Sequence, residues 1–276
     1  MQGFPSSFLI FLYQTALGGL LALAATPFND LDRAFYKSTG GVLCVIAILG
    51  LWGKSGFYSH SISANFSVAL AAEILLHILF VVFFVGYIVS LWTEHQRFRA
   101  RCFSGAILCG LAGLACSAHA FFPTELFSVE NVLYPISFIL SALLLGSVTV
   151  GMLIGHWYLI DTGQSLDPFI KIFKFFVYAL IVQGLFLVLF IIAIKIAGSP
   201  AGATALEKLW QNHSTLLVLR LVVGQAAPLV LSWMIWRTLL IPHTMAATGL
   251  FYIALLGVFV GEILGRQILA LTSLPF

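Results

Sequence analysis

Apolar residues run through this chain in long stretches that are separated by short segments carrying charges, proline or glycine. A helix needs about 20 predominantly apolar residues to cross a bilayer. The pattern predicts eight such helices, at about 6–26, 38–53, 66–92, 102–122, 131–159, 169–197, 212–239 and 245–271. The second is the shortest, and the stretch around 54–65 that follows it is the longest predicted connection.

The composition agrees with a membrane protein. Hydrophobic residues make up 61% of the chain, charged residues only 8%, and the mean hydropathy is +1.07, whereas soluble domains carry about 25% charged residues. We therefore expect residues 1–276 to form one all-α integral membrane domain, arranged as two four-helix bundles. The net charge of +3 is small, and no block of like charges suggests nucleic acid, so membrane lipids are the expected surroundings.

The positions of lysine and arginine predict the orientation. Connections after the second, fourth and sixth spans hold only Lys54, Lys195 and Lys208. The connections after the first, third, fifth and seventh spans hold most of the basic residues: Arg33, Lys37, Arg97, Arg99, Arg101, Lys171, Lys174 and Arg237. Because cytoplasmic connections are enriched in lysine and arginine, both termini should lie on the non-cytoplasmic side.

Several polar residues fall inside the predicted spans, where ionisable groups are costly and mark functional candidates. Counting about 1.5 Å per residue along each helix puts them all in the outer half of the bilayer. The set comprises Gln14, Glu73, His77, Arg220, Glu262 and Arg266. Within it, Glu73 and His77 share one helix face, as do Glu262 and Arg266, because each pair is four residues apart.

Small residues accompany these polar positions. Gly18 follows Gln14 by four residues, Gly224 follows Arg220 by four, and Gly257, Gly261 and Gly265 form a stripe beside Glu262 and Arg266. Such stripes allow helices to approach closely. We therefore expect the polar residues to face the interior of the bundle.

These residues allow a structural and a functional interpretation. Glu262 and Arg266 could form an ion pair that only locks the last helix, with Arg220 neutralising Glu73 or Glu262. Alternatively, a carboxylate, a histidine and an arginine in an apolar pocket suit a quinone, whose oxygens need hydrogen-bond partners. Glu73 and His77 could then exchange protons with it, and Arg220 could orient its head group.

The connection around 54–65 (KSGFYSHSISAN) is too short for a domain, but it could cap such a pocket. Phe57 and Tyr58 would then pack on the ligand, and His60 would lie at the mouth.

Three segments resemble a known family. The closing YIALLGVFVGEILGRQILAL is similar to the last helix of the DMSO reductase membrane anchor subunits, and FLYQTALGGLLALAA is similar to their first helix. In ALAAEILLH, Glu73 stands where that family carries a glutamate implicated at its quinol site. His77 has no counterpart that the resemblance assigns, and neither has the segment GMLIGHWYLIDTG around His156.

The resemblance has functional implications. It implies an eight-helix anchor subunit of a respiratory oxidoreductase in a bacterial or archaeal cytoplasmic membrane, related to polysulfide reductase membrane subunits. Menaquinone or ubiquinone would bind near the outer face, at Glu73 and His60. Electrons would pass between the quinone and an iron–sulfur or multihaem subunit docked there, and this chain itself would hold no haem. Whether the chain takes part in the quinol reaction or only anchors its partners stays open.

Two other classes remain. A b-type cytochrome subunit needs two inward histidines at matching depth, and His77 and His119 differ in predicted depth. A secondary transporter is the other alternative, although its site would be expected at the midplane rather than in the outer half.

Overall fold

The computed structural model describes residues 3–26, 31–64, 67–121, 128–161, 163–241 and 243–276. These residues form α1 (Phe4–Ala24), α2 (Arg33–Ala64), α3 (Val68–Ser90), α4 (Gln96–Phe121), α5 (Glu130–Ile160), α6 (Asp167–Ala197), α7 (Pro200–Asn212), α8 (Ser214–Leu221), the π-helical turn η1 (Val222–Ala226), α9 (Ala227–Leu239) and α10 (Thr244–Thr272). Helices α8, η1 and α9 follow one another as a single path. With that path counted once, eight helices of the described chain are long and apolar enough to cross a membrane, which confirms the all-α membrane fold.

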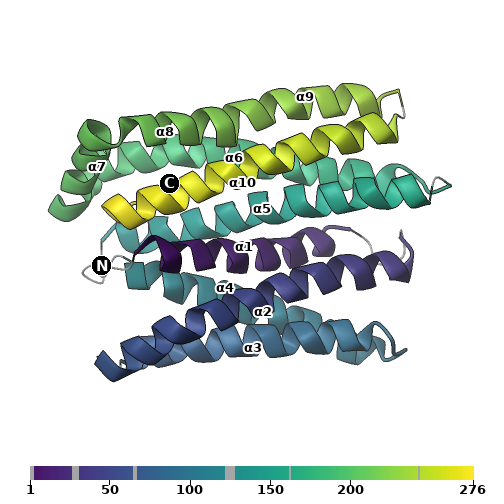
Figure 1. Ribbon diagram of the computed structural model, residues 1–276, viewed down its shortest axis with the longest axis horizontal. Coiled ribbons are helices and arrows are strands. Elements are labelled where there is room, and N and C mark those ends of the chain that lie inside the picture. The colour runs from purple at the N-terminus through teal and green to yellow at the C-terminus, as the bar shows by residue number, and fades with distance from the viewer. Residues whose placement is uncertain (1–2, 27–30, 65–66, 122–127, 162, 242) are drawn as a thin grey trace.

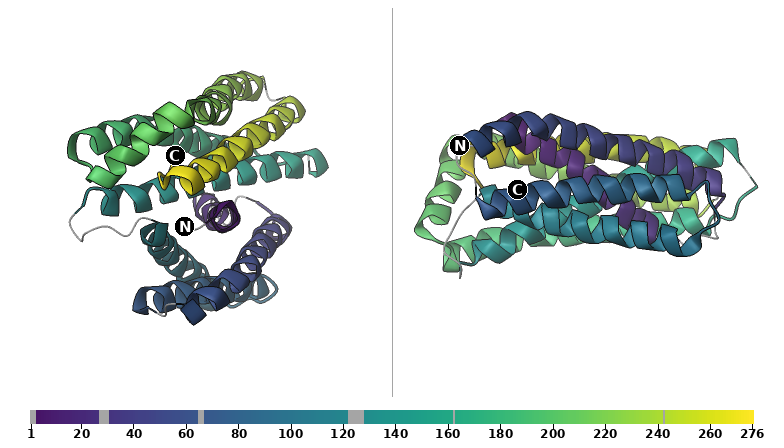
Figure 2. Two further views of the ribbon diagram at one scale, coloured as in Figure 1. Left: turned by 60° about the vertical axis from the view of Figure 1, so that its left-hand side comes forward. Right: turned by 90° about the horizontal axis from the view of Figure 1, so that it is seen from below.

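The eight long helices lie roughly along one common direction (Figure 1). Helices α1 to α4 occupy the lower half of that view and α5 to α10 the upper half, so the chain divides into the two predicted groups of four spans. Helix α1 joins the groups, because it packs on α5 and α10 as well as on α2. Figure 2 shows that both ends of the chain lie toward the same end of the bundle. The side of the membrane that this end faces stays a prediction.

The two groups meet where glycines let backbones touch. A Cβ atom on Gly18 would lie 1.6 Å from the carbonyl oxygen of Ala142, and one on Gly146 would lie 1.8 Å from the carbonyl carbon of Gly18. Within the second group, a similar contact joins η1 to α10, since a Cβ on Gly261 would lie 2.3 Å from Cα of Gly224. The close approach predicted from Gly18, Gly224 and Gly261 is confirmed.

Helix α2 differs from the prediction. It runs over 32 residues, from Arg33 to Ala64, whereas the predicted span was 38–53. The segment after residue 53 is therefore helical through Ala64 and is not a loop. Lys54 therefore lies inside a helix, and its side chain is buried. The apolar pattern stops at Lys54 because this residue and those after it line a polar site, not because the helix ends.

The region after α6 also differs from the prediction. Helix α7 begins at a Ser199 cap, whose side chain accepts a hydrogen bond from the Gly202 N–H, and it buries Leu206 and Leu209. The following span is interrupted by η1, where the Ala227 N–H bonds to the Val222 carbonyl five residues earlier. Pro228 has no N–H to donate, and a π-turn accommodates that loss.

Candidate functional site

The polar residues predicted to face the interior do so. Exposure is 7% for Glu73, 1% for His77 and 0% for Gln14, Arg220, Glu262 and Arg266. They do not share one hollow, however. Glu73 and His77 belong to α3 in the first group of helices, whereas the two arginines and Glu262 belong to α8 and α10 in the second. The structure therefore contains two separate polar clusters.

The first, which we call the Glu73 cluster, consists of Lys54, Tyr58, Glu73, His77 and Ser117. Lys54 Nζ donates to Glu73 Oε1 at 2.9 Å, and Ser117 Oγ donates to the same oxygen at 2.7 Å. Tyr58 adds a third hydrogen bond to Oε1, at 3.3 Å. Among the described residues, none donates to Oε2, so the second carboxylate oxygen is available to a ligand.

His77 is linked to this carboxylate through Ser117. Its Nδ1 lies 2.7 Å from the carbonyl oxygen of Glu73, which can only accept, so Nδ1 carries the proton. Nε2 then presents its lone pair, and Ser117 Oγ lies 3.5 Å from it. Ser117 also accepts from Lys54 Nζ at 3.2 Å. The serine hydroxyl thus lies between the carboxylate, the ammonium group and the imidazole.

Small residues on α4 make room for this arrangement. Tyr13 from α1 lies against the His77 ring, with ring centroids 4.2 Å apart, and its hydroxyl donates to the Gly110 carbonyl at 3.0 Å. A Cβ on Gly113 would lie 2.8 Å from that hydroxyl. The sequence analysis did not single out Lys54, Ser117 or Tyr13 as site residues. The one available signal was on α4, where Gly110, Gly113 and Ser117 follow one another at helical spacing.

A pocket of about 600 Å³ opens beside this cluster at the end of the bundle where the chain begins. The predicted capping residues Phe57, Tyr58 and His60 do line it, although from the last turns of α2 rather than from a loop. Gly56, Phe57 and His60 are exposed, so the pocket reaches the surface. The full lining is Gly3, Ser6, Lys54, Gly56, Phe57, Tyr58, His60, Ser61, Leu70 and Glu73.

The second group of polar residues, the Arg220 cluster, lies between α5, α6, α8, η1 and α10. Arg220 Nη2 donates to Glu262 Oε1 at 2.6 Å, and Arg266 Nη2 lies 3.3 Å from Glu262 Oε2. Gln183 Nε2 also donates to Glu262 Oε1, at 2.7 Å, and Gln225 donates to Gln183 at 2.7 Å. Ser141 Oγ accepts from Arg266 and Gln183.

This cluster corresponds to the structural interpretation, because Arg220 pairs with Glu262 and not with Glu73. Gln14 lies nearby but donates to the backbone carbonyl of Phe138, at 2.8 Å. Gln14, Arg220, Glu262 and Arg266 do not line the pocket beside Glu73. The candidate ligand site is therefore confined to Glu73, His60 and their neighbours, with His77 behind them.

The histidines considered for haem lie in unlike surroundings. His77 is buried and engaged by Glu73 and Ser117, whereas His119 is exposed in the last turn of α4. In the described part of the chain, no group of three or more His, Cys, Asp or Glu side chains is arranged to hold a metal ion.

Fold and sites together define a multi-pass integral membrane protein with a polar pocket at one end of its bundle. Comparison with protein-family models, with curated proteins and with solved structures finds no match to this chain. Its function is therefore argued from the pocket itself.

Proposed function

We propose that this protein is the membrane subunit of a respiratory oxidoreductase in a bacterial or archaeal cytoplasmic membrane, and that it binds menaquinone or ubiquinone, as quinone or quinol, beside Glu73. One observation carries the proposal. A buried carboxylate, held at one oxygen by Lys54, Ser117 and Tyr58, keeps its other oxygen available at the wall of a surface pocket.

The pocket suits a planar ring with two oxygens and an oily tail. Ligand sites combine mostly apolar walls with a few convergent polar groups. Phe57 and Leu70 supply apolar wall, and Lys54, Tyr58 and Glu73 supply donors and an acceptor on one side. His60 lies among the exposed lining residues, where it would meet a second ring oxygen or water at the mouth.

The residues also suit proton exchange. Oxidation of a quinol to the quinone releases two electrons and two protons, and this redox chemistry belongs to the ligand and not to the protein. Glu73 Oε2 accepts a proton from a bound hydroxyl, while Lys54 and Ser117 hold Oε1 in place. His77 Nε2, 3.5 Å from Ser117 Oγ, would be the base for the second proton once the serine hydroxyl turns from Glu73 toward the imidazole.

Electrons must leave this chain or enter it through another protein. The resemblance to the DMSO reductase anchors supplies the candidate, an iron–sulfur or multihaem subunit docked at the outer face. The pocket lies at the end of the bundle that is predicted to face outward, which fits such a partner.

The test is Glu73→Gln in the complex purified from its native membrane. The variant keeps the shape of the side chain but cannot take a proton as a carboxylate does, so quinol-dependent reduction of an artificial acceptor should fall at least a hundredfold. Glu207→Gln, an exposed glutamate on α7, is the matched control and should retain activity. Unchanged turnover in Glu73→Gln, with an intact complex, would contradict the proposal.

One observation favours a secondary transporter as a second candidate. The path α8–η1–α9 is interrupted by a π-turn, and Gln225 of that turn contacts the Arg220 cluster. Interrupted helices beside buried charges are common in transporters. Solute uptake by vesicles containing this protein alone would support that class, and haem absorbance in the purified chain would support a b-type cytochrome. Co-purified quinone with a multi-cofactor partner would support the first proposal.

A further inference from the structure

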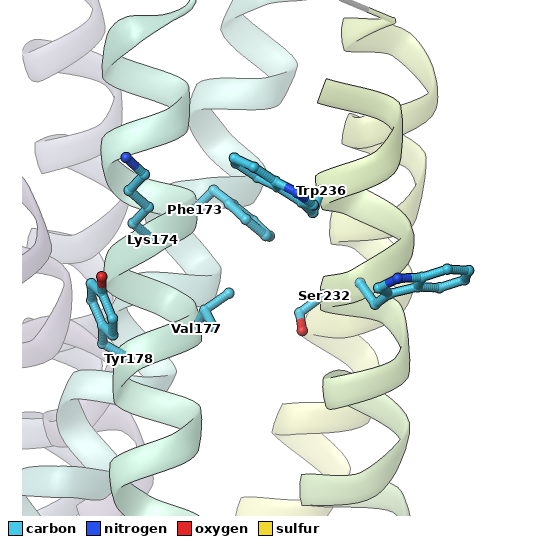
Figure 3. A pocket seen from close by; sticks show the side chains of 7 residues that line it. Phe173, Lys174, Val177, Tyr178, Ser232 and Trp236 are labelled. Atoms are coloured by element: carbon cyan, nitrogen blue, oxygen red, sulfur yellow. The ribbon is translucent and has the colours of Figure 1, made fainter. Parts of the chain in front are cut away.

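A groove of about 340 Å³ lies between α6 and α9, at the opposite end of the bundle from the Glu73 pocket. Figure 3 shows Phe173 and Val177 of α6 facing Ser232 and Trp236 of α9 across it, with Lys174 and Tyr178 along the α6 side. The Phe173 and Trp236 rings are nearly parallel, with an interplanar angle of 15° and centroids 6.0 Å apart.

The groove exists because α9 is held elsewhere. Helix α9 packs mainly on α10 and touches α6 only sparsely. Ser232 faces the gap with a side chain too small to fill it. Beyond the groove both helices present large exposed apolar side chains, which are Ile181, Val182, Leu185, Leu229 and Val230. The groove therefore opens onto the surface that faces the hydrocarbon of the bilayer.

Charge around the groove is positive. Lys174 lines it and is exposed, and the exposed Arg237 directly follows the lining residue Trp236 on α9. No acidic residue occurs in the lining segments 173–178 and 232–236, and Asp167 begins α6 two turns before Lys174. By contrast, the groove at the other end of α6 is lined by both Lys195 and Glu207, so it has no such excess.

The depth of the groove matches the boundary between lipid head groups and tails. Lys174 lies about 10 Å along α6 from its first residue, at about 1.5 Å per residue. Trp236 lies one turn before the end of α9. Tryptophan and tyrosine gather at this level of a bilayer. The lysine and arginine distribution predicts that this end is cytoplasmic, where anionic lipids give the membrane surface its negative potential.

We propose that this groove binds one anionic phospholipid. An acyl chain lies between α6 and α9 against Phe173 and Trp236, and Lys174 holds the phosphate. Uncharged lipid would fill the apolar gap equally well, so the preference for an anionic lipid rests on Lys174. Loss of one such lysine weakens anionic lipid binding about fivefold. This inference does not depend on the quinone proposal.

The test uses the full chain in phosphatidylcholine vesicles that contain either brominated phosphatidylglycerol or brominated phosphatidylcholine at equal mole fraction. Bromine quenches tryptophan fluorescence on contact. The contribution of Trp236 is the difference between the native protein and Trp236→Phe. We expect the anionic lipid to quench this contribution at several-fold lower mole fraction than the neutral one.

Three variants decide the outcome. Lys174→Gln should abolish the preference, and Lys195→Gln, on the same helix at its other end, should keep it. Ser232→Leu fills the groove without changing its charge and should reduce quenching by both lipids. Equal quenching by the two lipids in the native protein would overturn the proposal, because it would indicate ordinary boundary lipid. A preference that survives in Lys174→Gln would also overturn it.

Discussion

Lys54 of α2 and Glu73 of α3 form a buried ion pair, with Nζ and Oε1 2.9 Å apart, at the inner wall of the pocket. Their side chains are 8% and 9% exposed, so both charges are largely removed from water. Each compensates the other, which allows a carboxylate to persist at this depth. The pair therefore links α2 to α3 and fixes the position of the Glu73 carboxylate at the pocket wall.

Removing the ammonium group should leave an uncompensated carboxylate. We expect Lys54→Met to lower the free energy of unfolding by about 3 kcal/mol. The double variant Lys54→Met with Glu73→Leu removes both charges and should recover most of that loss. Denaturation of the detergent-solubilised protein measures both values. A double variant as unstable as the single one would show that the ion pair is not what stabilises this contact.

Ser117 links Glu73 to His77, so its hydroxyl should matter for quinol turnover. Ser117→Ala removes a hydrogen bond to a charged group, and we expect turnover to fall about tenfold or more while the fold is retained. Ser90→Ala is the control, because Ser90 is buried on the same helix as Glu73, and its hydroxyl donates to the Tyr87 carbonyl, away from the Glu73 cluster. Steady-state assay of the assembled complex distinguishes the two, and equal activities would argue against the serine link.

Glu262 is the shared partner of two fully buried arginines. Glu262→Gln leaves Arg220 and Arg266 without a counter-charge, and it should lower the free energy of unfolding by about 3–5 kcal/mol. Because this cluster does not line the pocket, quinone affinity per folded molecule should stay unchanged. Thermal unfolding and quinone titration of the same preparation test both statements. The exposed Glu207→Gln serves as the neutral comparison.

The contact between α1 and α5 should tolerate no side chain at Gly18. A methyl group there would overlap the Ala142 carbonyl, so Gly18→Ala should cost about 3 kcal/mol or more. Gly41→Ala in α2 should be neutral or stabilising by about 0.5–1 kcal/mol, because a Cβ there meets nothing within 4 Å. Two glycine-to-alanine changes in helices should thus have opposite signs. Similar effects at both positions would contradict the close packing at Gly18.

The predicted orientation can be tested by chemical labelling. In a background without the four native cysteines, Gln211→Cys on α7 and Arg97→Cys on α4 expose thiols at opposite ends of the bundle. An impermeant maleimide should label Gln211→Cys in intact cells, and Arg97→Cys only after lysis. The reverse pattern would mean that both termini face the cytoplasm.

The sequence predicted the membrane fold, the number of spans and the burial of all six polar candidates in the spans. The reason is that apolar length and the cost of a charge in lipid are properties of single helices. It failed where a polar residue within a helix looked like the end of that helix, as at Lys54. It also missed Ser117, because the helical spacing of Gly110, Gly113 and Ser117 indicates only a face of small residues, and the sequence does not show that Glu73 of α3 packs against that face.

The sequence by itself therefore determined that the chain spans a membrane eight times and that its buried charges face inward. Only the tertiary structure decided which charges meet. Glu73 and Glu262 have similar predicted depths, but α1 lies at the junction of the two groups, so Glu73 pairs with Lys54 and Glu262 with Arg220. The depth of a side chain in the membrane follows from its position along its own helix. Its charged partner, in contrast, depends on which helices lie next to that helix. Contacts such as that of Gly18 with Ala142 set those neighbours, and they join residues far apart in the chain.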